Sequence, residues 1–213
     1  MGSEVKVEWL GRIPYEEGLR IQEEIVAAKS GDLSEPDRLL LLEHEPVYTI
    51  GRSPDQSSLG RLEELPFRVI QTNRGGKATF HGPGQLVGYP ILDLRSRGQD
   101  LHRHLRVLET GLLEVCFRVG VRAGVREGLT GVWVGERKLA SIGVGVRRWI
   151  SMHGFALNVS GDLLGFSHIT PCGLAGVEMT SLEKEGALEC SVPALASIAG
   201  EIFSKLFLGH SSL

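Results

Sequence analysis

The sequence predicts an α+β fold, in which a mixed β-sheet is surrounded by helices. Strand-like segments concentrate in the middle of the chain, helix-like segments flank them, and no regular strand-helix alternation is present. With 42% hydrophobic and 23% charged residues, the composition is that of a globular protein and excludes a largely disordered chain. The 213 residues fit one domain, so residues 1–213 are expected to form a single domain.

Charge and cysteine content narrow the possible partners. The formal charge of -3 gives no global basic field for binding nucleic acid. No apolar run approaches the roughly 18 residues of a membrane span, and Glu4, Lys6 and Glu8 disagree with a secretory signal. Three cysteines without CxxC spacing argue against disulfides and a cysteine-zinc site. We therefore expect a cytoplasmic protein with no metal, no membrane partner and no nucleic-acid partner.

The first half of the chain begins with a strand and a helix. Residues 4–9 alternate polar and apolar side chains, as a strand with one buried face does. An amphipathic helix is predicted over 15–29, because Tyr15, Leu19 and Val26 share one side and Gly31 can stop it. Further buried strands are expected at 38–43, 46–50, 67–72 and 86–94.

The second half is predicted to contain a long helix, several hairpins and a final helix. The long helix buries Leu101, Leu105, Leu108, Leu112 and Val115, ends near Cys116, and turns His102, Arg103, Arg106 and Glu109 outward. Short apolar stretches between 121 and 159, broken by glycines and charge pairs, indicate hairpins. Ser191 and Pro193 open the final helix, whose buried stripe is Leu195, Ile198, Ile202 and Leu206.

Four common catalytic motifs are missing. The Gly75-Gly76-Lys77 stretch looks like the end of a phosphate loop, but Gln71 and Ala78 stand where such a loop needs glycine and a hydroxyl. No GxGxxG follows a strand, Ser141 lacks the upstream glycine of a nucleophile elbow, and His44-Glu45 has no second histidine. ATPase, dinucleotide-binding, serine-hydrolase and zinc-protease functions are therefore not the first choices.

Three segments carry candidate chemistry: 74–85, 137–143 and 170–174. The first is a glycine-dense loop between strands, whose backbone can approach a ligand and present amide N–H groups. A tight connection without a ligand is the alternative, and a single histidine such as His81 more often satisfies a local hydrogen bond than performs catalysis.

Cys172 is the candidate nucleophile, because it lies between Pro171 and Gly173 in a loop, whereas Cys116 continues an apolar helix stripe. The alternative is a small buried thiol. Lys138 is the candidate partner, since an ammonium among short side chains would be hard to desolvate alone. A solvated hairpin charge beside Arg137 is the other interpretation of Lys138.

These residues resemble the lipoyl(octanoyl) transferases of lipoate biosynthesis, which move an octanoyl group from acyl carrier protein to a lysine of a lipoyl domain. The resemblance covers most of the chain. Its segments are 15–23, 45–52, 74–85, 89–94, 131–133, 138–143, 153–158, 171–174 and 180–182, and His81-Gly82-Pro83-Gly84-Gln85 is the most specific. Ala78 and Ile50 are mild departures that leave the chemistry intact.

The resemblance implies that Cys172 forms an acyl-thioester and that Lys138 favours its thiolate and exchanges protons with it. It implies a fold similar to the catalytic domain of biotin and lipoate protein ligases, with no cofactor. It also implies that the acyl group is held by Arg74, Gly75, Gly76, Lys77, Ala78, Thr79, Phe80, His81, Ser141, Ile142, Gly143, Gly154, Phe155 and Ala156.

The implied partners are octanoyl-acyl carrier protein, the lipoyl domains of 2-oxoacid dehydrogenase complexes and the glycine cleavage H protein; a monomer is expected. Backbone amides near 75–76 or 172–173 could form an oxyanion hole. A basic docking surface for the acidic carrier is expected at Arg74, Lys77, Arg137, Arg147 and Arg148.

Three alternative functions stay open at this point. An ATP-using lipoate or biotin ligase of the same fold would bind an adenylate and not need Cys172. A binding module for acyl chains or lipoyl domains would leave the thiol inert. A cysteine hydrolase is weaker, because the spacing shows no cysteine-histidine pairing.

Overall fold

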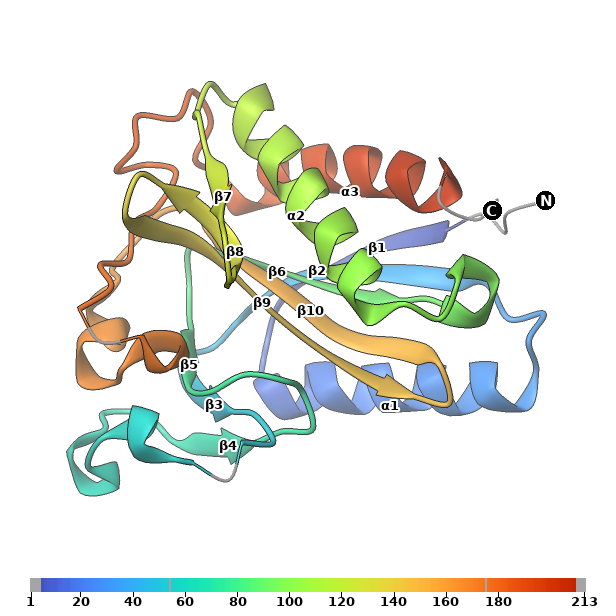
Figure 1. Ribbon diagram of the computed structural model, residues 1–213, viewed down its shortest axis with the longest axis horizontal. Helices are drawn as coiled ribbons and strands as arrows, with labels where there is room; N and C mark the ends of the chain where they lie inside the picture. The colour runs from blue at the N-terminus through green and yellow to red at the C-terminus, as the bar shows by residue number, and fades with distance from the viewer. Residues whose placement is uncertain (1–4, 54, 175, 210–213) are drawn as a thin grey trace.

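A seven-stranded mixed sheet forms the centre of the computed structural model, which describes residues 5–53, 55–174 and 176–209 (Figure 1). The strand order is β1-β2-β6-β10-β9-β8-β7. Only β1 and β2 are parallel within it. The strands are β1 Val5–Ile13, β2 Asp37–His44, β6 Gln85–Ile91, β7 Gly124–Arg126, β8 Leu129–Val134, β9 Arg137–Arg147 and β10 Ile150–Asn158. The predicted mixed sheet of an α+β protein is confirmed.

Helices cover both faces of this sheet. In Figure 1, α2 (Leu101–Arg118) and α3 (Val192–Gly209) lie on one face and α1 (Tyr15–Gly31) on the other. The larger core joins α2 and α3 to the sheet, and there the rings of Phe155 and Phe203 stack with centroids 5.0 Å apart. The smaller core packs Val26 of α1 against Leu40 and Tyr89. Burial on both faces fixes the strand register.

The last helix, α3, is long and apolar enough for a membrane span when only length and composition are considered, with a mean hydropathy of 1.3. In the fold, its apolar side packs into the larger core through Leu195, Ile202 and Phe203. A core helix of a globular protein passes the same test.

A three-stranded sheet with the order β4-β3-β5 lies beside the main sheet. Its strands are β3 Val47–Ile50, β4 Val69–Gln71 and β5 Thr79–His81, and the short 3-10 turns are η1 Ser57–Leu59, η2 Leu62–Glu64, η3 Leu94–Arg97, η4 Leu164–His168 and η5 Pro171–Gly173. A third core of Tyr48, Phe80 and Phe166 holds this sheet against η4. The glycine-dense segment 74–78 connects β4 to β5 and is anchored at both ends.

Most predicted elements are confirmed, with shifts at their ends. The strand expected over 86–94 ends at Ile91, because Leu94–Arg97 turns into η3 after Asp93, whose carboxylate accepts a hydrogen bond from the Arg95 N–H. Glu4 lies outside the described residues. The hairpins expected between 121 and 159 are present as β7–β8, β8–β9 and β9–β10.

The predicted faces of the long helix need two corrections. Glu109, expected outside, is only 2% exposed: it pairs with Arg106 and accepts a 3.0 Å hydrogen bond from the Gly131 N–H of β8. Leu101, expected inside, is 37% exposed in the first turn. A helical period shows which residues share a side, but it does not show where a neighbouring strand presents a donor that needs a buried acceptor.

Candidate active site

Cys172 lies in the short turn η5 with a left-handed backbone conformation (φ 56°). This conformation costs a residue with a side chain about 1–3 kcal/mol, so the surroundings must enforce it. The Cys172 N–H donates to the carbonyl of Ala78 at 2.9 Å, and the Thr170 N–H donates to the carbonyl of Ser58 at 2.8 Å. Two backbone contacts with the small-sheet region thus fix the turn that presents the thiol.

Lys138 stands at the start of β9, next to an irregularity in the sheet. Between β8 and β9, Val132 pairs with Ala140 but Trp133 pairs with Lys138, so β9 contains one extra residue there. Such bulges re-aim side chains next to active sites. The backbone of Lys138 is held from the other side, where its N–H donates to Glu178 at 2.8 Å. Lys138 is therefore fixed by neighbours on both sides.

The Nζ of Lys138 lies 3.1 Å from the Sγ of Cys172. Lys138 is 2% exposed, and its ammonium also lies 5.1 Å from the centre of the Trp133 ring. A nearly dry ammonium strongly favours an anionic neighbour, and the thiol is the side chain to which Nζ donates. The solvated-charge interpretation of Lys138 is wrong, because its burial excludes it.

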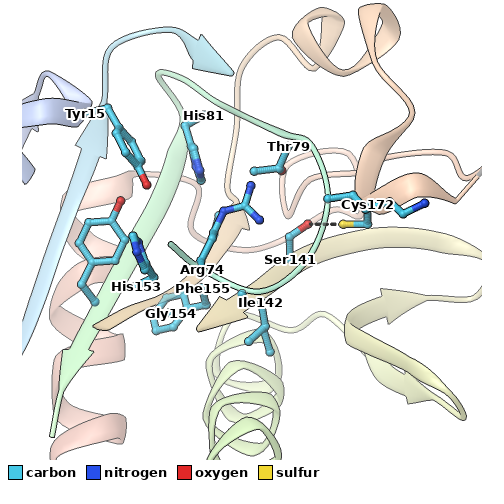
Figure 2. Close-up of a pocket in the computed structure, with 15 residues that line it drawn as sticks. Tyr15, Arg74, Thr79, His81, Ser141, Ile142, His153, Gly154, Phe155 and Cys172 are labelled. Carbon is cyan, nitrogen blue, oxygen red and sulfur yellow. Dashed lines mark hydrogen bonds between the residues drawn. The ribbon is translucent and has the colours of Figure 1, made fainter. Parts of the chain in front are cut away.

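Ser141 is a second neighbour of the Cys172 thiol, and it carries a hydroxyl group. Its Oγ lies 3.8 Å from the Sγ of Cys172, as the dashed line in Figure 2 marks. It comes from β9, three residues after Lys138, so one strand supplies both side chains that contact the sulfur. This geometry places an ammonium and a hydroxyl around one reactive atom.

A pocket begins at Cys172 and contains about 470 Å³, including the part open to solvent. Figure 2 shows Cys172 and Ser141 at one end and Tyr15, His81 and His153 at the other. The lining residues are Tyr15, Arg74, Gly76, Lys77, Thr79, His81, Tyr89, Ser141, Ile142, Gly143, His153, Gly154, Phe155, Ala156 and Cys172.

Arg74 carries a buried positive charge into this pocket. It is 7% exposed, and its guanidinium donates to Thr49 and Gly75 oxygens, all of them uncharged. Burial lowers its pKa from the ordinary value, while Tyr15 and Cys172 act in the opposite direction. A charge without a carboxylate partner in these contacts adds positive potential beside the thiol.

The histidines near the pocket are neutral at physiological pH. Burial lowers the pKa of His81 to about 3 and that of His153 to about 3. The Nδ1 of His81 lies 2.7 Å from the Oε1 of Gln85, so a local hydrogen bond accounts for this residue. Among the described residues, the side chains that contact the sulfur of Cys172 are Lys138 and Ser141, not a histidine. This arrangement does not support a cysteine-histidine hydrolase.

Most of the residues predicted for acyl binding do line the pocket. Gly75, Ala78 and Phe80 do not. Gly75 is tied to Val144 through its N–H, and Ala78 contributes its carbonyl to the Cys172 turn. Phe80 packs on the opposite side of β5, in the third core. Its neighbours Thr79 and His81 face the pocket because side chains alternate along a strand.

Three lining residues were not predicted from the sequence: Tyr15, Tyr89 and His153. All three lie in segments that carry the family resemblance, which was the available signal. Tyr15 begins α1, Tyr89 lies in β6, and the His153 backbone has a positive φ of 56° within β10. Tyr15 and His153 lie at the end of the pocket opposite Cys172 (Figure 2), and Tyr89 also lines the pocket.

The five residues predicted for a basic docking surface do not form one exposed cluster. Arg74 is buried, Lys77 pairs with Asp55 at 2.6 Å, and Arg137 pairs with Glu185 at 2.9 Å. Arg147 and Arg148 lie at the far end of β9, about 30 Å from Lys138 at the ~3.3 Å rise of a strand. Of these five residues, Arg74 and Lys77 line the pocket.

The oxyanion-hole prediction is narrowed in a similar way. The N–H groups of Gly75, Cys172 and Gly173 already donate to backbone carbonyls. Among the described residues, the N–H of Gly76 forms no hydrogen bond to a backbone carbonyl, and Gly76 lines the pocket. A free N–H group at this position can donate a hydrogen bond to an oxygen of a ligand.

Comparisons with known proteins identify the family of this chain. Residues 14–204 match the family model described as the lipoyl protein ligase A/B catalytic domain. A protein named octanoyltransferase from Citrifermentans bemidjiense is 54% identical over 203 residues, which covers 94% of this chain and 96% of the relative. An octanoyltransferase from Geobacter sp. strain M21 is 57% identical over 178 residues, covering 83% of this chain and 84% of that relative.

Solved structures show the same fold. A crystal structure of lipoate-protein ligase A bound with ATP gives a TM-score of 0.75 at 15% identity, covering 97% of this chain and 85% of that one. Biotin protein ligase from Aquifex aeolicus gives a TM-score of 0.56 at 14% identity, covering 95% of this chain and 70% of that one. The predicted likeness to the catalytic domain of lipoate and biotin ligases is confirmed. The chain therefore belongs to the lipoyl protein ligase A/B catalytic-domain family and is an acyltransferase of the octanoyltransferase type.

Proposed function

We propose that this protein transfers an octanoyl group from octanoyl-acyl carrier protein to a lysine ε-amine of a lipoyl domain, through a thioester on Cys172. The observation that carries the proposal is the 3.1 Å contact between the buried Lys138 ammonium and the Cys172 sulfur at the end of a pocket. The names of the close relatives support octanoyl as the group transferred. We take residues 1–213 as one catalytic domain.

In the first half-reaction, the Cys172 thiolate attacks the thioester carbonyl carbon of the donor. A new carbon-sulfur bond forms to Sγ, and the bond to the sulfur of the carrier's prosthetic group breaks. The departing thiolate takes a proton from the Lys138 ammonium, which leaves Lys138 neutral. The 3.1 Å contact supports this role. A nitrogen this close to the attacking sulfur is also close to the leaving sulfur, because both sulfur atoms are bonded to the same carbonyl carbon during the transfer.

In the second half-reaction, a lysine of the lipoyl domain attacks the acyl-enzyme. A free lysine has a pKa near ~10.4, so its ammonium must lose a proton before it can act as a nucleophile. The ammonium loses that proton to solvent. As the resulting amine attacks the thioester carbonyl, neutral Lys138 takes a second proton from the nitrogen, the amide bond forms, and the carbon-sulfur bond to Cys172 breaks. The thiolate and the ammonium are then restored. Because a thioester becomes an amide, the transfer needs no nucleotide.

Negative charge develops on the carbonyl oxygen in each half-reaction. The hydroxyl of Ser141, 3.8 Å from Sγ, can reach an oxygen one bond beyond the carbon that Sγ attacks. Gly76, whose N–H donates to no backbone carbonyl among the described residues, lines the same pocket. We propose these two donors as the oxyanion hole. The N–H groups of Gly75, Cys172 and Gly173 already donate to backbone carbonyls.

The acyl chain is proposed to enter the pocket past Ile142, Phe155 and Ala156, whose apolar side chains line it. The carrier and the acceptor must then approach the same mouth in turn, since one thiol serves both. This agrees with a ping-pong order. The acceptors are expected to be lipoyl domains of 2-oxoacid dehydrogenase complexes and the glycine cleavage H protein.

Incubation with octanoyl-acyl carrier protein in the absence of ATP, followed by intact-mass measurement, tests this function. The wild-type chain should gain one octanoyl group, and Cys172→Ser should not, whereas Cys190→Ser should gain it as the matched control. A ligase would transfer the group from free octanoate only with ATP and would tolerate Cys172→Ser. Octanoylation of the lipoyl domain that is independent of Cys172 would overturn the proposal.

A further inference from the structure

The Gly131-Val132-Trp133 stretch of β8 lies against Lys138, the residue that contacts the Cys172 sulfur. Gly131 has a backbone φ of +127°, and a Cβ placed there would lie 2.9 Å from the Cε of Lys138 and 3.5 Å from its Nζ. It would also lie 2.5 Å from the carbonyl oxygen of Ala140. Only a residue without a side chain leaves this space open. The end of the Lys138 side chain fills the space that a side chain at position 131 would take.

Trp133 contributes a second contact. The Lys138 ammonium lies 5.1 Å from the centre of its ring, within the range of a cation–π contact. Trp133 is buried, and the bulge between β8 and β9 falls beside it. Lys138 thus extends through a slot between Gly131 and Trp133 toward Cys172.

The buried carboxylate of Glu109 holds the backbone of Gly131, which forms one side of this slot. Glu109 of α2 accepts a 3.0 Å hydrogen bond from the Gly131 N–H and pairs with Arg106 through its second oxygen. At 2% exposure, a carboxylate is expensive to bury unless it makes contacts that matter to the fold. The Gly131 N–H faces away from the strand ladder toward α2 and would be unsatisfied without it.

We infer that Glu109 and Gly131 are positioning residues that aim the Lys138 ammonium at the Cys172 sulfur. Glu109 fixes the backbone of Gly131, and Gly131 leaves the passage through which the lysine extends. This inference rests on the proposed function, because it assigns a purpose to the lysine-cysteine contact. Neither residue touches the sulfur, so both act through Lys138.

Gly131→Ala tests the slot, and the readout is the rate of Cys172 alkylation by iodoacetamide at neutral pH. The added methyl group should displace the ammonium, reduce the thiolate fraction and slow alkylation at least about tenfold, the size of a lost charge-assisted hydrogen bond. Gly128→Ala and Gly135→Ala are matched controls. Both glycines lie in the adjoining hairpin turns at positive φ, +74° and +58°, but nothing lies within 4 Å of their Cβ positions. They should alkylate at the wild-type rate.

Substitutions of Glu109 test the anchor independently, should Gly131→Ala not fold. Glu109→Gln keeps an oxygen that can accept from Gly131, whereas Glu109→Ala removes it. We expect Glu109→Ala to slow Cys172 alkylation several-fold and Glu109→Gln to restore most of the rate. Glu114→Ala, on the exposed side of the same helix, is the control. Circular dichroism at the assay temperature shows that each variant is folded.

The inference would be overturned if Cys172 of Gly131→Ala were alkylated at the wild-type rate, or if the two control glycine variants lost as much of the alkylation rate as Gly131→Ala. Equal losses in Glu109→Gln and Glu109→Ala would overturn the role of the hydrogen bond. Failure of the proposed function would look different, because the wild-type protein itself would then show no selective Cys172 reactivity and no octanoyl adduct.

Discussion

Lys138 and Cys172 are separated by 34 residues in the sequence, yet Nζ and Sγ lie 3.1 Å apart, with the ammonium almost fully removed from water. One residue lies on a sheet strand and the other in a left-handed turn, and backbone hydrogen bonds hold both. The contact therefore does not depend on a flexible side chain finding its partner.

Replacing the lysine should stop acyl-enzyme formation while the fold persists. Lys138→Met keeps the length of the side chain and removes the charge and the proton donor. We expect the first-turnover rate with octanoyl-acyl carrier protein to fall by at least about 100-fold, the usual loss of a general acid. Rapid-quench mass measurement provides the rate. Lys184→Met, at an exposed position, should keep it, and a normal rate in Lys138→Met would exclude the lysine from the chemistry.

The three cysteines should differ strongly in reactivity. Burial raises the pKa of the Cys116 thiol to about 12, and burial together with Glu183 and Glu189 raises that of Cys190. Both remain protonated at neutral pH and should react slowly with iodoacetamide, whereas Cys172 beside Lys138 should react first. Peptide mapping after brief alkylation provides the order. Equal labelling of Cys190 and Cys172 would show that the ammonium does not activate the thiol.

The Ser141 hydroxyl should matter to the chemical step. Ser141→Ala removes one of the two proposed oxyanion donors, and the rate of acylation should fall by roughly 100-fold with little change in donor affinity. Stopped-flow kinetics at saturating donor separates rate from affinity. Ser197→Ala, on the exposed side of α3, is the control. A loss of affinity alone would assign Ser141 to donor binding.

Acid should destabilise the protein through its buried histidines. Burial lowers the pKa of His104 to about 4, whereas an unfolded histidine titrates near ~6.5. Between these values the unfolded state binds a proton that the folded state does not, so the free energy of unfolding falls as the pH falls, by about 1.4 kcal/mol per pH unit for each such group. His104 lies away from the pocket. Urea unfolding from pH 6.5 to 4.5 should show a smaller decrease for His104→Leu than for wild type. Equal slopes would mean that this histidine titrates normally in the fold.

Periodicity predicted most of the fold because two cores impose it. The stripes of α1 and α3 and the alternation in the strands reflect burial against a sheet, which sequence patterns record. Glu109 was placed wrongly because its partner, the Gly131 N–H, belongs to another element. The resemblance implies that the whole segment 74–81 holds the acyl group, but Phe80 does not line the pocket, because alternation along β5 puts its side chain opposite those of Thr79 and His81.

The candidate site was predictable in its parts but not in its assembly. The glycine loop, Lys138 and Cys172 stand out in the sequence, and the family resemblance joins them. Their distances depend on a bulge in β9 and on a strained turn at Cys172, which are set by tertiary contacts. Backbone hydrogen bonds also occupy the N–H groups of Gly75, which donates to Val144, and Gly173, which donates to Thr170 in its own turn; no sequence pattern shows this.

The most direct measurement is a chase experiment without ATP. Wild-type protein loaded with octanoyl-acyl carrier protein is freed of the carrier, mixed with a lipoyl domain, and sampled by peptide mass spectrometry. We expect an octanoyl group on the Cys172 peptide that disappears at the same rate as octanoyl-lysine appears on the lipoyl domain. Octanoyl-lysine that appears while the Cys172 peptide stays unmodified throughout would contradict this expectation.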